Sequence, residues 1–283
     1  MKGIKELLLV FLRGIFMGMA DIVPGVSGGT IALITGIYER LIFAINAITP
    51  RSLKELFLAK NKREVLERMD SLFLVTVLVG VAIAFLAMSW VIRFFMGTYP
   101  ANTYAFFFGL ILASAGFVYR YVGRISPVII VSGIIGFAFA FIFVGLGTLQ
   151  SSHSLPVIFF SGFIAICAMM LPGISGAFIL FFLGQYEYML GVLHSVNVPL
   201  ITVFLIGAIT GLFVMSKVLG YLLRNYKAVT MSCLLGLMLG ALRLPYENVI
   251  SNAYTLPVVI ASALTGFFTV VMLEKVAGKV GKS

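Results

Sequence analysis

Two stretches of the chain, PGVSGGTIALITGIY at residues 24–38 and PGISGAFILFFLGQY at residues 172–186, place proline, glycine and serine inside apolar sequence. Proline ends a helix, and glycine permits tight backbone turns. A helix that begins after such a break presents unpaired N–H groups and the positive end of its dipole. These groups, together with the hydroxyls, can bind an anion without a buried positive charge. Two such breaks that face each other can hold a phosphate between them.

The residues that we expect to bind the phosphate come from the two breaks and from basic positions in or near apolar runs. The other interpretation is that serine and glycine only cap the helices and let them pack closely, as small residues do in membranes. The sequence leaves open which basic residue would hold the phosphate. The candidates are Pro24, Gly25, Ser27, Gly28, Gly29, Thr30, Gly173, Ser175, Gly176, Arg40, Arg93 and Lys217.

Three acidic residues, Asp21, Glu39 and Glu187, lie in apolar runs, where ionisable side chains are costly and usually functional. Each glutamate follows its break at the same spacing, roughly 15–18 Å along one unbroken helix. We expect the glutamates to carry protons from opposite membrane faces. Pairing with a neighbouring base, or reaching the interface, is the alternative. Asp21 can cap the break, pair with Arg13 or Arg40, or bind a cation.

Motifs for other chemistries are absent from the sequence. It contains no GxxxxGK[ST], no HExxH and no CxxC, so we expect neither a cofactor nor a metal site. Cys167 and Cys233 both lie in apolar runs, where they fit small buried hydrophobes better than a disulfide. No run of charge suggests nucleic acid.

The composition is that of a polytopic membrane protein. Of 283 residues, 61% are hydrophobic and only 11% are charged, whereas soluble domains contain about 25% charged residues. Several apolar runs reach about 20 residues, the length that crosses a bilayer. We therefore predict an all-α chain of transmembrane helices, and we attribute its net charge of +10 to loops on one side of the membrane.

The chain consists of two related halves. Ser27, Tyr38 and Glu39 correspond in register to Ser175, Tyr186 and Glu187, and the later spans correspond after a polar insert is removed. The predicted units are a first repeat at 1–126 with a hairpin at 7–48 and the polar insert at 51–70, the last span of that repeat with an outer linker at 127–154, and a second repeat at 155–283 with a hairpin at 156–194.

Short apolar arms on both sides of each break indicate re-entrant hairpins rather than full spans. Non-helical backbone at membrane depth is tolerated only where protein covers it or where it lines a cavity. One hairpin and three spans per half is an odd number of crossings, so the second half is inverted relative to the first. This arrangement is typical of secondary transporters. The basic loops then lie on the cytoplasmic side, together with both termini.

The two break sequences resemble the signatures of a known family. MADIVPGVSGGTIALITGIYERLI at 19–42 and MMLPGISGAFILFFLGQYEYML at 169–190 are similar to those of the bacterial polyprenyl-phosphate transporters, PopT-like proteins long described as a domain of unknown function. The resemblance covers essentially the whole chain. It implies that undecaprenyl phosphate, the carrier lipid of cell-wall sugars, is moved from the outer to the inner leaflet of the bacterial cytoplasmic membrane. It does not fix the coupling ion, H⁺ or Na⁺, or the oligomeric state.

Two other functions stay open at the level of sequence. A membrane phosphatase acting on undecaprenyl pyrophosphate has similar serine-rich breaks, but a hydrolase needs a nucleophile with a base. Here no histidine lies within either break motif, and His153 and His194 fall near the outer side. An anion channel or small-ion transporter could use the same helix ends. We expect a transporter rather than an enzyme.

Overall fold

The computed structural model describes residues 3–22, 27–58, 61–146 and 151–280, apart from the side chains of 88, 89, 93, 194 and 273–280. Pro24 and Gly25 lie outside the described residues. Throughout the described part of the chain the regular structure is helical, which confirms the predicted all-α class.

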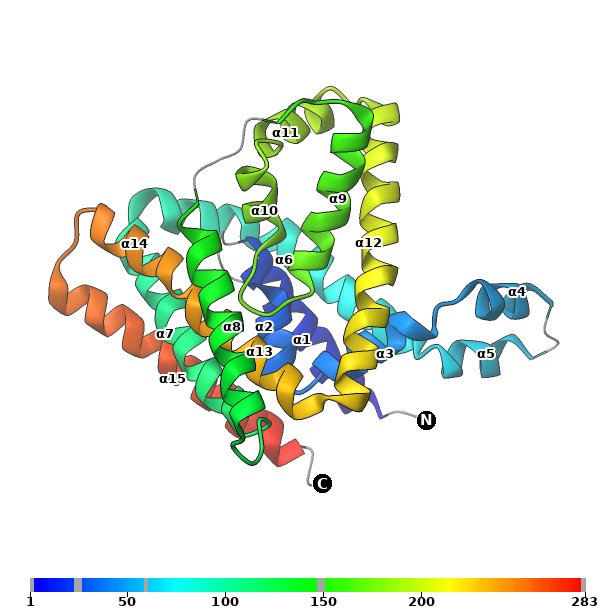
Figure 1. Cartoon of the computed structure of the whole chain (residues 1–283), viewed down its shortest axis with the longest axis horizontal. Coiled ribbons are helices and arrows are strands. Elements are labelled where there is room, and N and C mark those ends of the chain that lie inside the picture. Colours follow the sequence, from blue (N-terminus) through cyan, green and yellow to red (C-terminus); the bar gives the residue numbers. More distant parts are fainter. Residues whose placement is uncertain (1–2, 23–26, 59–60, 147–150, 281–283) are drawn as a thin grey trace.

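The described residues form fifteen helices (Figure 1). Their bounds are α1 Ile4–Ile22, α2 Gly28–Ile34, α3 Tyr38–Ala47, α4 Pro50–Leu58, α5 Lys62–Arg68, α6 Ser71–Thr98, α7 Pro100–Tyr119, α8 Pro127–Val144, α9 Leu155–Met169, α10 Gly176–Phe182, α11 Tyr186–His194, α12 Val198–Asn225, α13 Lys227–Ala241, α14 Arg243–Ser251 and α15 Leu256–Val280.

Among the described residues, four helical segments are long and apolar enough to cross a membrane: Pro100–Tyr119, Pro127–Val144, Val198–Asn225 and Lys227–Ser251. The number rises to 7 if each bent pair of helices forms one span. Many large apolar side chains on these helices are exposed, for example Ile134 at 60%. In a membrane protein such side chains face lipid, so the structure agrees with a multi-pass chain.

Close approach between glycines and carbonyl groups joins the long helices in pairs. A Cβ atom at Gly80 of α6 would collide with the carbonyl oxygen of Phe11 in α1. In the same way, a Cβ at Gly207 of α12 would collide with the carbonyl oxygen of Phe159 in α9. Without water to drive association, membrane helices rely on such close packing. The pairs α1–α6 and α9–α12 therefore have the same packing basis.

Two sharp bends follow the breaks. The axis turns by 113° between α2 and α3 and by 110° between α10 and α11. At each bend a glycine takes a left-handed conformation, Gly36 with φ 74° and Gly184 with φ 66°, which side-chain-bearing residues rarely adopt. The prediction of one unbroken helix from each break to its glutamate is therefore wrong, and the 15–18 Å estimate fails with it. Glu39 and Glu187 lie in the first turns of α3 and α11 instead.

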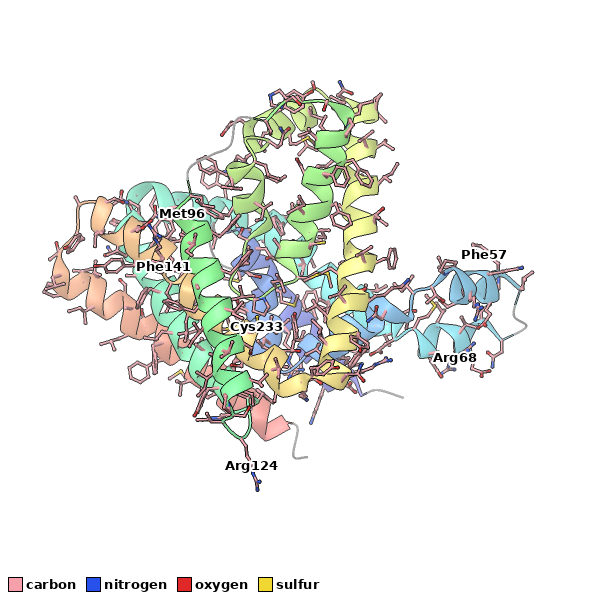
Figure 2. The ribbon with its side chains drawn as sticks, in the orientation of Figure 1. Phe57, Arg68, Met96, Arg124, Phe141 and Cys233 are labelled. Carbon is pink, nitrogen blue, oxygen red and sulfur yellow. The ribbon has the colours of Figure 1, made fainter. Side chains whose placement is uncertain are left out.

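The polar insert forms two short helices, α4 and α5, which project away from the other helices (Figures 1 and 2). Arg68 of α5 pairs with Glu55 of α4 at 2.8 Å. Val65 is buried between them, whereas Phe57 at the end of α4 is 81% exposed. The insert is thus helical and amphipathic, and it contributes no residue to the centre of the fold described below.

We expect Gly207→Leu to destabilise the protein strongly, because the new side chain would force α12 away from Phe159 in α9. Gly116→Leu is the matched control, since a Cβ at Gly116 meets nothing within 4 Å. Overpacking of this kind costs about 1–3 kcal/mol or more. Thermal unfolding of the two purified variants in detergent measures the difference. Equal midpoints would contradict the glycine packing argument.

Candidate functional site

The two breaks meet at the centre of the fold. Ser27 caps α2, with its hydroxyl oxygen accepting a hydrogen bond from the Gly29 N–H at 3.1 Å. The same hydroxyl lies 3.3 Å from the carbonyl oxygens of Met169, the last residue of α9, and of Leu171, just before the second break, and it can donate to them. Ser27 is fully buried. Its side chain therefore joins the halves as well as capping a helix.

Two further hydrogen bonds cross between the breaks. The Gly173 N–H donates to Thr30 Oγ1 at 3.0 Å, and the Tyr38 hydroxyl donates to the Met170 carbonyl at 3.0 Å. Gly173 has φ 90°, and a Cβ there would lie 2.9 Å from Cα of Met238. Side chains of the first half thus satisfy non-helical backbone of the second half, in a region where water cannot do so.

Asp21 lies where α1 ends and accepts a hydrogen bond from the Gly28 N–H at 2.7 Å. Of the interpretations open from sequence, the cap is the one observed. Arg40 is not its partner, because Arg40 pairs with Asp70 at 2.6 Å and with Glu6 at 3.2 Å. A side chain at position 28 would collide with the Asp21 carboxylate.

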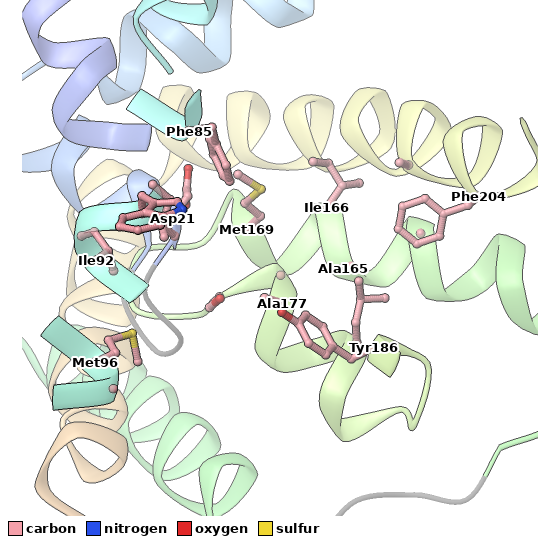
Figure 3. Close-up of a pocket in the computed structure, with 18 residues that line it drawn as sticks. Asp21, Phe85, Ile92, Met96, Ala165, Ile166, Met169, Ala177, Tyr186 and Phe204 are labelled. Carbon is pink, nitrogen blue, oxygen red and sulfur yellow. The ribbon is translucent and has the colours of Figure 1, made fainter. Parts of the chain in front are cut away.

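A cavity of about 870 Å³ opens beside this junction (Figure 3). Its size falls within the usual range for ligand sites. The walls come from the ends of α1 and α6, from α9, α10 and α12, and from the start of α11. The lining residues are Asp21, Ile22, Phe85, Trp90, Ile92, Met96, Gly97, Gly162, Ala165, Ile166, Met169, Ser175, Gly176, Ala177, Leu180, Tyr186, Phe204 and Ala208.

The equivalent residues of the two halves differ in their surroundings. Ser27 and Tyr38 are buried and bonded, as described above. Ser175 and Tyr186 line the cavity, and their hydroxyls bond to no residue in the described part of the chain. Ser175 as a whole is only 4% exposed, but its unbonded hydroxyl oxygen is not a buried atom, and the residue lines the cavity. The second half therefore supplies the free polar groups.

The basic candidates lie in different places. Arg40 is held by its two acidic partners and stacks on Phe73, 4.2 Å from the ring centroid, outside the cavity. Lys217 is exposed on α12 and does not line the cavity. Arg93 lies on α6 between the lining residues Trp90 and Met96, and the structure describes its backbone only. Its position makes Arg93 the basic candidate closest in sequence to the cavity wall.

The two candidate glutamates are not equivalent either. Glu39 Oε1 pairs with Lys227 Nζ at 2.6 Å, which ties α3 to the start of α13. Glu187 is exposed and forms no ion pair with any residue that the structure describes. No group of three His, Cys, Asp or Glu side chains in the described residues could hold a metal ion. The acidic residue at the cavity is Asp21.

Tyr186 and Trp90 line the cavity but are not among the residues predicted from sequence. The repeat could have indicated Tyr186, because its counterpart Tyr38 occupies the same register after the first break. Trp90 is the single tryptophan of the chain, but nothing in its sequence context indicates that it faces a cavity. Of the predicted residues, Asp21, Ser175 and Gly176 do line this cavity.

These features define an all-helical, multi-pass membrane protein with a central cavity at the junction of two broken helices. The chain belongs to the undecaprenyl phosphate translocase-like family, whose family model matches residues 17–257. It is 40% identical over 238 residues to a polyprenyl-phosphate transporter of Vibrio cholerae, covering 83% of this chain and 76% of that protein.

A second relative, a polyprenyl-phosphate transporter of Staphylococcus aureus, is 28% identical over 286 residues. That match covers 95% of this chain and 96% of the relative. No solved structure matches the chain. The resemblance on the two break motifs is thereby confirmed at the level of the family.

We expect Thr30→Val to destabilise the junction, because it leaves the buried Gly173 N–H without an acceptor while keeping the side-chain volume. An unsatisfied buried donor costs about 1–3 kcal/mol. Thr210→Val is the control, since the Thr210 hydroxyl is exposed and donates only to Ile206 of its own helix at 2.7 Å. Thermal unfolding in detergent compares them. If Thr30→Val is no less stable than Thr210→Val, the hydrogen bond between Thr30 and Gly173 does not contribute this stabilisation.

Proposed function

We propose that this protein carries undecaprenyl phosphate, or a similar polyprenyl phosphate, from the outer to the inner leaflet of a bacterial cytoplasmic membrane, returning carrier lipid to cell-wall synthesis. The observation that carries the proposal is the central cavity, into which the unbonded hydroxyls of Ser175 and Tyr186 face. The names of the relatives in Vibrio cholerae and Staphylococcus aureus support the substrate class.

The architecture that we propose is the inverted repeat of 1–126 and 155–283, joined by 127–154, with re-entrant hairpins at 7–48 and 156–194. The matched helix pairs α1–α6 and α9–α12 and the two matched bends support it. The start of α1, the end of α15, the α12–α13 junction and the α7–α8 turn with Arg124 lie at the same edge of the view (Figures 1 and 2). That edge is the proposed cytoplasmic side, because its loops are basic.

A phosphate that enters an apolar protein needs substitutes for its hydration. In the proposed complex the Ser175 and Tyr186 hydroxyls donate to phosphate oxygens. Gly176 contributes by close packing, because a Cβ there would lie 2.9 Å from the Ala165 carbonyl oxygen of α9. Arg93 supplies the positive charge from α6. Hydrogen bonds to a charged group are stronger than neutral ones, by a factor of about two.

Asp21 suits the role of coupling group best, because it lines the same cavity as the proposed phosphate. Two negative charges in a poorly hydrated site repel each other strongly. Phosphate binding therefore favours a neutral Asp21 carboxyl or a bound cation beside it, which links lipid movement to a proton or Na⁺. Glu39 is paired with Lys227, and Glu187 is exposed, so neither lies beside the phosphate.

The contacts of the described histidine favour transport over hydrolysis. A hydrolase with Ser175 as nucleophile would need a base beside the hydroxyl. His153 instead lies with Nδ1 3.1 Å from Gln185 Oε1 and with its ring stacked on Tyr188. No described histidine lines the cavity. The same groups can bind a phosphate and release it unchanged.

Leaflet exchange of undecaprenyl phosphate in proteoliposomes tests the proposal. We expect the wild type to exchange the lipid, and the Ser175→Ala/Tyr186→Phe variant to bind it at least about 10-fold more weakly, from the loss of hydrogen bonds to a charged group. Ser251→Ala is the control, because Ser251 is exposed and bonds only within its own helix. If the wild type exchanges nothing under a proton or Na⁺ gradient, or cleaves the pyrophosphate, the transporter proposal is wrong.

A second prediction concerns coupling. Asp21→Asn keeps an acceptor for the Gly28 N–H but cannot take up a proton. We expect this variant to exchange the lipid at a rate that no longer responds to an imposed proton or Na⁺ gradient. Glu39→Gln and Glu187→Gln are compared in the same assay, and we expect both to retain the response. A response retained by Asp21→Asn and lost by a glutamate variant would assign coupling to that glutamate.

A further inference from the structure

A second cavity, of about 580 Å³, lies between α1, α2, α6, α7 and α15. Its walls are mostly aliphatic and aromatic, and it contains no charged side chain among the described residues. We refer to it as the apolar groove. Characteristic lining residues are Phe16, Ile31, Phe95, Phe107, Leu110 and Thr265.

The apolar groove adjoins the central cavity. Ile92 of α6 lines both spaces and is 9% exposed. On α1, Ala20 lines the groove while the next residue, Asp21, lines the central cavity. On α6, Phe95 lines the groove and the next residue, Met96, lines the cavity. Two helices thus separate a space with polar groups from a space without charge.

The threonines of the groove donate their hydroxyls to backbone carbonyl oxygens. Thr103 lies 2.8 Å from the Tyr99 carbonyl and 3.1 Å from the Phe95 carbonyl of α6. Thr265 donates to the Ser262 carbonyl at 2.7 Å and Thr269 to the Thr265 carbonyl at 2.7 Å. These hydroxyls are therefore satisfied without a ligand. The threonines can present their methyl groups to an occupant, and the polar side chains that remain in the lining are those of Tyr99, Asn102 and Ser262.

We propose that the apolar groove binds the phosphate-proximal isoprene units of the same polyprenyl phosphate whose headgroup occupies the central cavity. This inference rests on the proposed function. The occupant follows from the geometry: an amphiphile with an apolar chain attached directly to a phosphate matches two adjoining spaces, one lined by Asp21, Ser175 and Tyr186 and the other without a charged side chain among the described residues. Phe16, Phe95 and Phe107 offer broad apolar faces to a branched, unsaturated chain.

The volume of the groove limits how much of the lipid's polyprenyl chain it can enclose. A space of about 580 Å³ is of the size that holds a drug-sized ligand, and it can enclose only the first units of a long polyprenyl chain. Thr265 on its wall is exposed. The rest of the chain passes out beside it into lipid, so the groove contacts the phosphate-proximal isoprene units and not the far end of the chain.

Blocking the groove provides the test. We expect Thr265→Phe to weaken binding of undecaprenyl phosphate at least tenfold, and to leave competition by inorganic phosphate at the central cavity unchanged. Thr210→Phe is the matched control, because Thr210 is also an exposed threonine bonded to its own helix and lines neither space. Binding is measured in nanodiscs by native mass spectrometry.

A second measurement needs no variant. An undecaprenyl phosphate analogue with a photoreactive group on its first isoprene unit should label peptides of α7 and α15 in the wild type. Labelling confined to helices that do not line the groove would overturn the proposal, as would equal affinities of Thr265→Phe and Thr210→Phe, or a loss of inorganic phosphate competition in Thr265→Phe. If the wild type binds no polyprenyl phosphate at all, the proposed function itself is wrong, and the groove proposal falls with it.

Discussion

The structure depends on how non-helical backbone is satisfied inside an apolar protein. The second break carries carbonyl and N–H groups that no helix pairs and that bulk water does not reach. Thr30 and Tyr38 of the first half pair with these groups at 3.0 Å, and Ser27 lies within bonding distance of two more. Each lost bond would leave a buried polar group unpaired. The two halves are therefore held in one relative position at their centres.

These hydrogen bonds give the two similar break sequences different roles. The first half uses its serine and tyrosine as structural ligands for the second half. The second half keeps the equivalent Ser175 and Tyr186 unbonded among the described residues, and both face the central cavity. A symmetric pair of breaks could not have satisfied both needs, since the same hydroxyl cannot both seal the junction and remain free to donate to a ligand.

Asp21 connects structure with the proposed transport. Its carboxylate caps the start of α2 and forms part of the cavity wall. The negative charge of an anion in the cavity is therefore repelled by the Asp21 carboxylate, which the fold needs as a cap. In the proposed transport, a proton or cation taken up at this point lowers the repulsion, and the adjoining apolar groove is the proposed site for the part of the lipid that carries no charge. The proposal thereby places headgroup, chain and coupling group around α1 and α6.

The sequence by itself determined the helical membrane class, the family and the positions of both breaks, because hydrophobic composition, glycine and proline act locally. It also indicated Ser175, Gly176 and Asp21 for the site. It did not predict that Gly36 and Gly184 end the half-helices, or that Tyr186 lines a cavity. Only the tertiary structure decided which of two equivalent hydroxyls forms hydrogen bonds within the protein and which stays unbonded. That choice depends on which backbone groups of the other half lie within bonding distance, and sequence spacing does not contain this information.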